Sequence, residues 1–110
     1  MNPWLLLGVS ILAEVAGTTA LKLSDGFTRP LYTLLVPLFY GASFYVFSGA
    51  VRYLDLGLAY AIWAGLGTVC IALLSVVFFG ESMNVIKLVS MTAIVAGVIG
   101  LNLASGHAAA

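Results

Sequence analysis

Four apolar stretches, each about 20 residues long, make up most of this 110-residue chain. They cover residues 4–21, 31–51, 57–79 and 85–104, and a helix needs about 20 residues to cross the hydrocarbon core of a bilayer. Hydrophobic residues account for 63% of the chain and charged residues for 7%, which excludes an ordinary water-soluble domain. The segments of about 10 alternating residues expected of a transmembrane β-barrel are absent. The sequence therefore predicts an all-α membrane protein with four transmembrane helices.

The connections between these stretches are too short to form a separate domain. We expect residues 1–110 to form a single four-helix, multi-pass transmembrane domain in the lipid bilayer. The sequence has one cysteine, no cluster of His and Cys residues, and no Gly-rich phosphate loop. It therefore predicts no metal site, no cofactor, no nucleic-acid partner and no enzymatic activity.

Glu14 is a lone carboxylate in the middle of the first apolar stretch. On insertion scales, a charged residue at the centre of the bilayer costs about 2.5 to 3.5 kcal/mol, so such residues mark functional sites by default. No basic residue lies deep within the spans to neutralise it. Glu14 is therefore the main candidate for binding a proton or a substrate.

Small and hydroxylated residues share the face of Glu14 if the first stretch is helical. Positions three, four and seven residues away lie on one side of a helix. Small side chains there predict a cavity or a close helix approach, because they occupy little volume. The residues of this face that we assign to a substrate pocket are Leu7, Ser10, Gly17 and Thr18.

Aromatic residues in the second and third stretches are further candidates for a pocket around Glu14. Tyr40, Ser43 and Phe44 fall on one face of the second stretch, and Tyr60 and Trp63 on one face of the third. A carboxylate beside aromatic rings suits a lipophilic organic cation, because the rings add about 0.5 to 2 kcal/mol of attraction as the site loses water. The pattern predicts a cation-binding pocket lined by these residues.

The fourth stretch carries a row of small residues, Ala93, Gly97 and Gly100, which is typical of a helix–helix contact. Its expected partner is the same helix of a second copy. Four helices barely enclose a pore, whereas two copies would give eight helices and a pair of Glu14 side chains. We therefore expect a homodimer.

The chain resembles the small multidrug resistance family of proton-coupled exporters almost from end to end. The resemblance rests on the stretches Leu12-Ala-Glu-Val-Ala-Gly-Thr-Thr19, Ser24-Asp-Gly-Phe-Thr28, Ala42-Ser-Phe44 and Gly57-Leu-Ala-Tyr-Ala-Ile-Trp-Ala-Gly-Leu-Gly67. Gly17 makes the chain similar to the multidrug, quaternary-ammonium branch of this family, since guanidinium exporters typically carry tryptophan at this position. The chain departs from the family pattern at Asp55, where relatives usually have proline, and at Ser90, where glycine is common.

The resemblance implies an antiparallel homodimer that exchanges protons for hydrophobic or quaternary-ammonium cations at a shared Glu14 site. It also implies a bacterial inner (plasma) membrane as the location of this multi-pass protein. It implies that Trp63 and Tyr60 contact the substrate, and that Tyr40 and Ser43 line the pocket and support the glutamate. Gly65 and Gly67 would form a bend that differs between the subunits, and Gly97 would hold the dimer together.

Other functions remain open at this stage. The same fold could export a polyamine, a guanidinium or a lipid, and a passive cation channel would move cations without protons. In a membrane assembly subunit, Glu14 would pair with a basic residue of a partner's helix.

The orientation of the chain in the membrane is open as well. The bias of basic residues toward one side favours termini outside, while the resemblance implies insertion in both directions. The basic residues concerned are Lys22, Arg29 and Lys87 on one side and Arg52 on the other.

Overall fold

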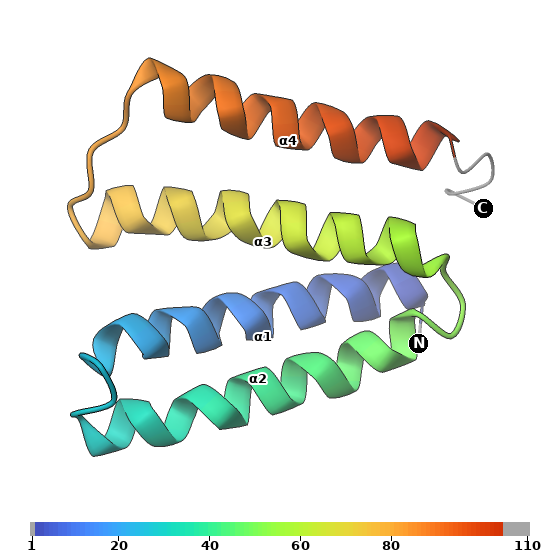
Figure 1. The fold of residues 1–110 in the computed structure, drawn as a ribbon. Coiled ribbons are helices and arrows are strands. Elements are labelled where there is room, and N and C mark those ends of the chain that lie inside the picture. The colour runs from blue at the N-terminus through green and yellow to red at the C-terminus, as the bar shows by residue number, and fades with distance from the viewer. Residues whose placement is uncertain (1, 105–110) are drawn as a thin grey trace. The chain divides into compact units, whose positions relative to one another are not determined.

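The computed structural model describes residues 2–104. Its four helices, in chain order, are α1 (Pro3–Leu23), α2 (Pro30–Ala50), α3 (Leu56–Phe78) and α4 (Val85–Ala104) (Figure 1). All four are long and apolar enough to cross a membrane. The prediction of an all-α membrane protein is confirmed, and each helix begins and ends within about two residues of its predicted span.

The chain forms two compact units, Met1–Tyr53 and Leu54–Ala110. The first contains α1 and α2, which run antiparallel as a hairpin (Figure 1). Asn2 caps α1 by accepting a hydrogen bond from the Trp4 backbone N–H at 2.8 Å. Pro3 and Pro30 occupy the first turns of their helices, where a missing N–H costs nothing.

The turn between α1 and α2 is built around Ser24, which is fully buried. Its backbone carbonyl accepts a hydrogen bond from the Thr28 N–H at 2.9 Å, and its hydroxyl oxygen accepts one from the Phe27 N–H at 3.1 Å. Asp25, Gly26 and Phe27 all have positive φ angles, of 51°, 70° and 65°. The sequence predicts a turn at Asp25-Gly26, and the structure adds Phe27, a residue type that rarely takes this conformation.

Apolar side chains fill the contact between α1 and α2. Gly17 is decisive here, because a Cβ built on it would lie 2.9 Å from Cδ1 of Tyr40 and 3.2 Å from Cβ of Phe39. Glycine therefore permits the two helices to approach closely at this level. The buried apolar residues of these helices are Leu7, Ile11, Ala20, Val36 and Ala50.

The second unit contains α3 and α4, joined by an exposed connection. Gly80 has a φ of 69°, and the Glu81 backbone N–H donates to the Ser75 carbonyl at 3.1 Å, which closes the end of α3. Asn84 then caps α4 by accepting a hydrogen bond from the Lys87 backbone N–H at 2.8 Å. The end of α3 and the start of α4 therefore use conventional turn and capping chemistry.

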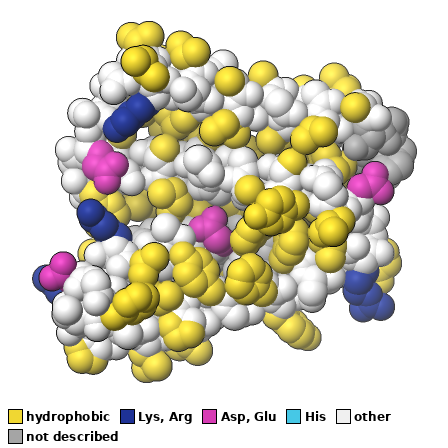
Figure 2. Space-filling model, viewed as in Figure 1, with side chains coloured by type: hydrophobic (Ala, Val, Ile, Leu, Met, Phe, Trp, Pro, Cys, Tyr) yellow, Lys and Arg dark blue, Asp and Glu magenta, His cyan; other side chains and the backbone are white. Residues whose placement is uncertain are grey.

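Charged residues lie at the ends of the helices, apart from Glu14. Figure 2 shows hydrophobic side chains over much of the visible face, with Lys and Arg side chains toward its edges. Lys22 belongs to the last turn of α1 and Arg29 is the N-cap of α2. This distribution fits a protein whose helices cross a bilayer, since charges are costly at its centre.

Candidate functional site

Glu14 lies near the middle of α1 and is half-buried. Thr18, one helical turn further along, donates its hydroxyl hydrogen to Oε2 of Glu14 at 2.7 Å. The spacing of four residues places both side chains on one face of the helix, as the sequence predicts. The carboxylate is thus held by its own helix, near the middle of a segment that is long and apolar enough to cross a membrane.

Tyr40 of α2 continues this contact across the hairpin. Its phenol oxygen lies 2.6 Å from the hydroxyl oxygen of Thr18. The ring can reach Thr18 because Gly17 leaves open the space that a Cβ would fill. The structure therefore joins Glu14, Thr18 and Tyr40 in one hydrogen-bonded chain, with Thr18 in the middle.

Ser10 and Ser43 form a second link between α1 and α2. The Ser43 hydroxyl donates to the backbone carbonyl of Ser10 at 2.7 Å, and the Ser10 hydroxyl donates to that of Leu7 at 2.7 Å. Both serines are fully buried and Leu7 is 2% exposed. The Ser43 hydroxyl thus ties α2 to α1 about one turn from Glu14, whereas the Ser10 hydroxyl bonds within α1. The contact of these residues with a bound cation stays a prediction.

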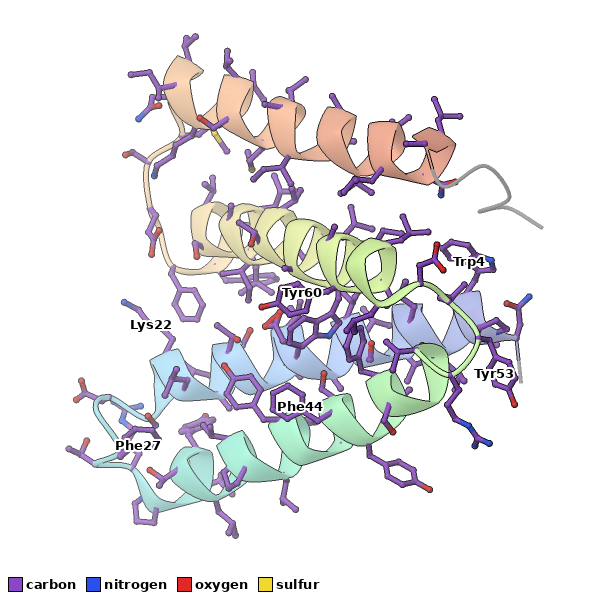
Figure 3. All side chains as sticks on the ribbon, turned by 45° about the vertical axis from the view of Figure 1, so that its right-hand side comes forward. Trp4, Lys22, Phe27, Phe44, Tyr53 and Tyr60 are labelled. Atoms are coloured by element: carbon purple, nitrogen blue, oxygen red, sulfur yellow. The ribbon has the colours of Figure 1, made fainter. Side chains whose placement is uncertain are left out.

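Phe44 is not part of the buried contact formed by Ser10 and Ser43. It lies on α2 next to Ser43 and is 58% exposed; Figure 3 shows its ring on the same hairpin as Lys22 and Phe27. An exposed ring on a membrane helix can contact lipid, a substrate or another subunit. Its place in the pocket stays a prediction.

In the second unit, the structure brings the predicted substrate aromatics together. The ring centroids of Tyr60 and Trp63 lie 5.7 Å apart, with an angle of 39° between their planes. Tyr60 is 56% exposed, and Trp63 is half-buried. This pair is an aromatic surface on α3 of the kind that attracts an organic cation.

The predicted bend residues of α3 have different surroundings. A Cβ on Gly65 would lie 3.0 Å from Cγ2 of Val98 and 3.1 Å from Cγ2 of Ile94, so Gly65 permits a close approach of α3 and α4. Gly67 is buried. Both lie within one continuous helix, Leu56–Phe78, and their role as a bend stays a prediction.

The predicted dimer residues of α4 are all open in the single chain. Ala93, Gly97 and Gly100 are exposed, and a Cβ on either glycine would meet nothing within 4 Å. This surface can therefore accept a neighbouring helix without displacing any side chain. Within residues 2–104, no group of three or more His, Cys, Asp or Glu side chains could hold a metal ion.

Comparison with known proteins decides the family. The family model described as Small Multidrug Resistance protein matches residues 2–94. This chain belongs to the small multidrug resistance family. The family resemblance of the sequence is thereby confirmed, and with four spans the chain is a multi-pass membrane protein.

Three relatives illustrate how closely the chain follows this small multidrug resistance pattern. It is 46% identical to the multidrug transporter EmrE of Escherichia coli, and 44% identical to the quaternary ammonium compound-resistance protein QacF of Klebsiella aerogenes. Each match covers 96% of both proteins. It is 43% identical to the membrane protein YvaE of Bacillus subtilis, over 91% of this chain and 84% of that protein.

Proposed function

We propose that this protein exports hydrophobic or quaternary-ammonium cations in exchange for protons, by alternating access at a site formed around Glu14. The observation that carries the proposal is a carboxylate at the middle of a membrane helix, held in place by the hydroxyl of Thr18. The relatives support the substrate class, because one is named a multidrug transporter and another a quaternary ammonium resistance protein.

Proton and cation compete because they use the same group. A carboxylate in a low-dielectric site resists carrying a bare charge, so it binds either a proton or a cation. Since each ligand excludes the other, their binding is negatively coupled, and a proton arriving from the acidic side expels the cation. If only loaded transporters change the side to which they open, exchange is obligatory.

The aromatic residues supply the remaining attraction for the cation. The tilted pair Tyr60 and Trp63 offers ring faces, which bind organic cations with about 0.5 to 2 kcal/mol depending on desolvation. No further cofactor is needed, because the proton gradient and the membrane potential drive export. The potential contributes about 2.3 kcal/mol per net charge per 100 mV.

The transporter is proposed to be an antiparallel homodimer with two copies of Glu14. The open surface of Ala93, Gly97 and Gly100 on α4 supports this, because small residues let a second helix approach closely. Sealed vesicles offer a direct test: the C-terminal tail should be accessible from both faces. A tail that is accessible from one face in every copy would contradict the antiparallel arrangement.

The test of the exchange mechanism is proton release on cation binding. Purified protein in weakly buffered detergent solution should release protons when tetraphenylphosphonium is added, and should bind it more weakly as the pH falls. A membrane assembly subunit would not bind the cation without its partner. A passive channel would carry cations in proteoliposomes without proton countermovement. Absence of cation binding by the purified protein, or cation flux without proton countermovement, would therefore overturn the proposal.

We expect Trp63→Ala to weaken the binding of tetraphenylphosphonium by about 1 to 2 kcal/mol, because the indole face is removed from the cation. Trp63→Phe keeps an aromatic ring and should lose less. Trp4→Ala, at the start of α1 and far along that helix from Glu14, serves as the control. Isothermal titration of the three variants checks the order, and an unchanged affinity for Trp63→Ala would remove this ring from the site.

A further inference from the structure

A proline interrupts the backbone hydrogen bonds in the first half of α2. Pro37 lies inside this helix, which continues through it to Ala50. Proline has no backbone N–H, so the carbonyl of Thr33, four residues earlier, cannot form its usual helical hydrogen bond. The proline ring also crowds that carbonyl, which is why helices bend at internal prolines. The helix is therefore easier to bend at Pro37 than along its regular turns.

Thr33 loosens the same part of the helix in a second way. Its backbone N–H donates to the carbonyl of Arg29 at 2.9 Å, and its hydroxyl donates to the same oxygen at 2.8 Å. A threonine hydroxyl that bonds back to the preceding turn often bends a helix. Two independent features thus favour a bend between Arg29 and Pro37.

The two sides of Pro37 differ in how firmly they pack against α1. None of residues 30–35 is buried. The hydrogen bonds that Tyr40 and Ser43 make to α1, at 2.6 and 2.7 Å, both lie beyond the proline. α2 is therefore fixed to α1 after Pro37 and packs loosely before it. The buried residues of α2, which are spaced seven apart and so share one face, are Val36, Ser43 and Ala50.

We propose that α2 bends at Pro37, and that residues 30–36 swing as a gate at the end of the Glu14 site nearest the turn between α1 and α2. The part of α2 beyond the proline keeps Tyr40 next to Thr18, so the gate moves without disturbing the group that holds the carboxylate. Pro37 is exposed in the single chain, so a change of bend there does not displace α1. This inference rests on the proposed function, because alternating access requires part of the site to open and close.

Distances between spin labels in lipid nanodiscs test the bend. Cys70→Ala first removes the single cysteine of the sequence. Leu12→Cys on α1 is then combined with Leu31→Cys, before the proline, or with Tyr45→Cys, after it; all three side chains are exposed. Dilution of the labelled protein with unlabelled protein ensures that each distance lies within one chain.

The two label pairs should behave differently. The segment from Pro37 to Leu31 spans about 9 Å of helix, so a bend of about 20° moves its end by roughly 3 Å. We therefore expect two distances, separated by up to about 3 Å, for the pair at Leu12 and Leu31. The pair at Leu12 and Tyr45 should give one distance, because α2 is fixed to α1 beyond the proline.

Pro37→Ala restores the backbone N–H and should favour the straight helix. It should merge the two distances of the pair at Leu12 and Leu31. It should also slow export of tetraphenylphosphonium from proteoliposomes by about 3- to 10-fold, because bending then breaks one hydrogen bond. The affinity for tetraphenylphosphonium should stay the same, since Glu14 and its partner Thr18 lie outside the gate.

Two further variants separate the hydrogen bond from other effects of the proline. Pro37→Gly also restores the N–H but leaves the helix flexible, so it should slow export less than Pro37→Ala. Pro30→Ala is the matched control, because it removes a proline from the first turn of the same helix, where a missing N–H costs nothing. It should change neither the distances nor the export rate.

The outcomes separate this inference from the function on which it rests. A single distance for the pair at Leu12 and Leu31 in wild type would overturn the hinge. Two distances of equal separation in both label pairs would overturn it as well, since α2 would then move as a whole. Wild-type distances and export rate in Pro37→Ala would have the same consequence. Absence of proton-coupled export by the wild-type protein would instead overturn the proposed function, and the label distances would still decide whether α2 bends.

Discussion

Replacement of Glu14 by glutamine is expected to abolish both the release of protons on cation binding and the exchange of cation for proton. Glutamine has nearly the same shape and can still accept the hydrogen bond of Thr18, which is 2.7 Å long in the wild type. It cannot carry the negative charge that balances the cation, and it cannot take up a proton at physiological pH. Loss of one member of a desolvated charge pair costs about 2 to 5 kcal/mol, so cation affinity should fall at least about 30-fold.

The measurement is transport of a lipophilic cation into proteoliposomes under an imposed pH gradient, together with proton release by the purified protein. Glu81→Gln is the matched control, because it makes the same substitution at an exposed carboxylate between α3 and α4. The Glu14→Gln protein should still assemble as wild type does. Coupled transport by this variant would refute Glu14 as the exchange residue.

Glu14→Asp addresses the geometry of the same group. Aspartate keeps the charge but shortens the side chain, so the carboxylate moves away from its partner Thr18. We expect exchange to persist with an altered dependence on pH, because both the desolvation and the hydrogen bonding of the carboxylate change. Transport rates measured across a pH series would check this, and a profile identical to that of wild type would show that the reach of the side chain is unimportant.

The four helices were predictable from the sequence because each is marked by a long run of apolar residues. A span of about 20 apolar residues outweighs any local preference, and proline or asparagine marks the starts of α1, α2 and α4. Pro37 illustrates the rule, since it lies inside α2 and the helix continues through it. Neighbouring helices and the apolar surroundings stabilise such a helix in a membrane.

The site was predictable only within each helix. Glu14 and Thr18 share a face because they are four residues apart on α1, and helical geometry fixes that relation. The link from Thr18 to Tyr40 depends on how α2 is rotated against α1, which the sequence of α2 alone does not encode. That rotation follows from packing at Gly17 and from the bond between Ser43 and the Ser10 carbonyl.

Some neighbours could not be foreseen for the same reason. Phe39 approaches Gly17, and Ile94 and Val98 approach Gly65. Each is an ordinary apolar residue of a membrane helix, and nothing in its own position distinguishes it from residues that contact lipid. The signal in the sequence is the partner glycine, which indicates a close approach but does not identify what approaches.

Gly17→Val is expected to destabilise the hairpin of α1 and α2 and, with it, to disable cation binding. Even a Cβ at this position would lie 2.9 Å from Cδ1 and 3.0 Å from Cε1 of Tyr40, and 3.2 Å from Cβ of Phe39. The obstructing atoms belong to a rigid ring and to a carbon next to the backbone, so relief requires α2 to move. Overpacking of this kind destabilises a protein by about 1 to 3 kcal/mol. Because valine is branched, we expect its destabilisation to lie at the upper end of this range.

Displacement of α2 would also separate Tyr40 from Thr18, whose oxygens are 2.6 Å apart. The loss of function should therefore exceed the loss expected from stability alone. Gly8→Val is the matched control, since Gly8 lies on the same helix and a Cβ there would meet nothing within 4 Å. Thermal unfolding in detergent and titration with tetraphenylphosphonium should both distinguish the two variants. Equal behaviour would mean that the ring of Tyr40 can leave Gly17 without cost, and that this contact does not position the carboxylate.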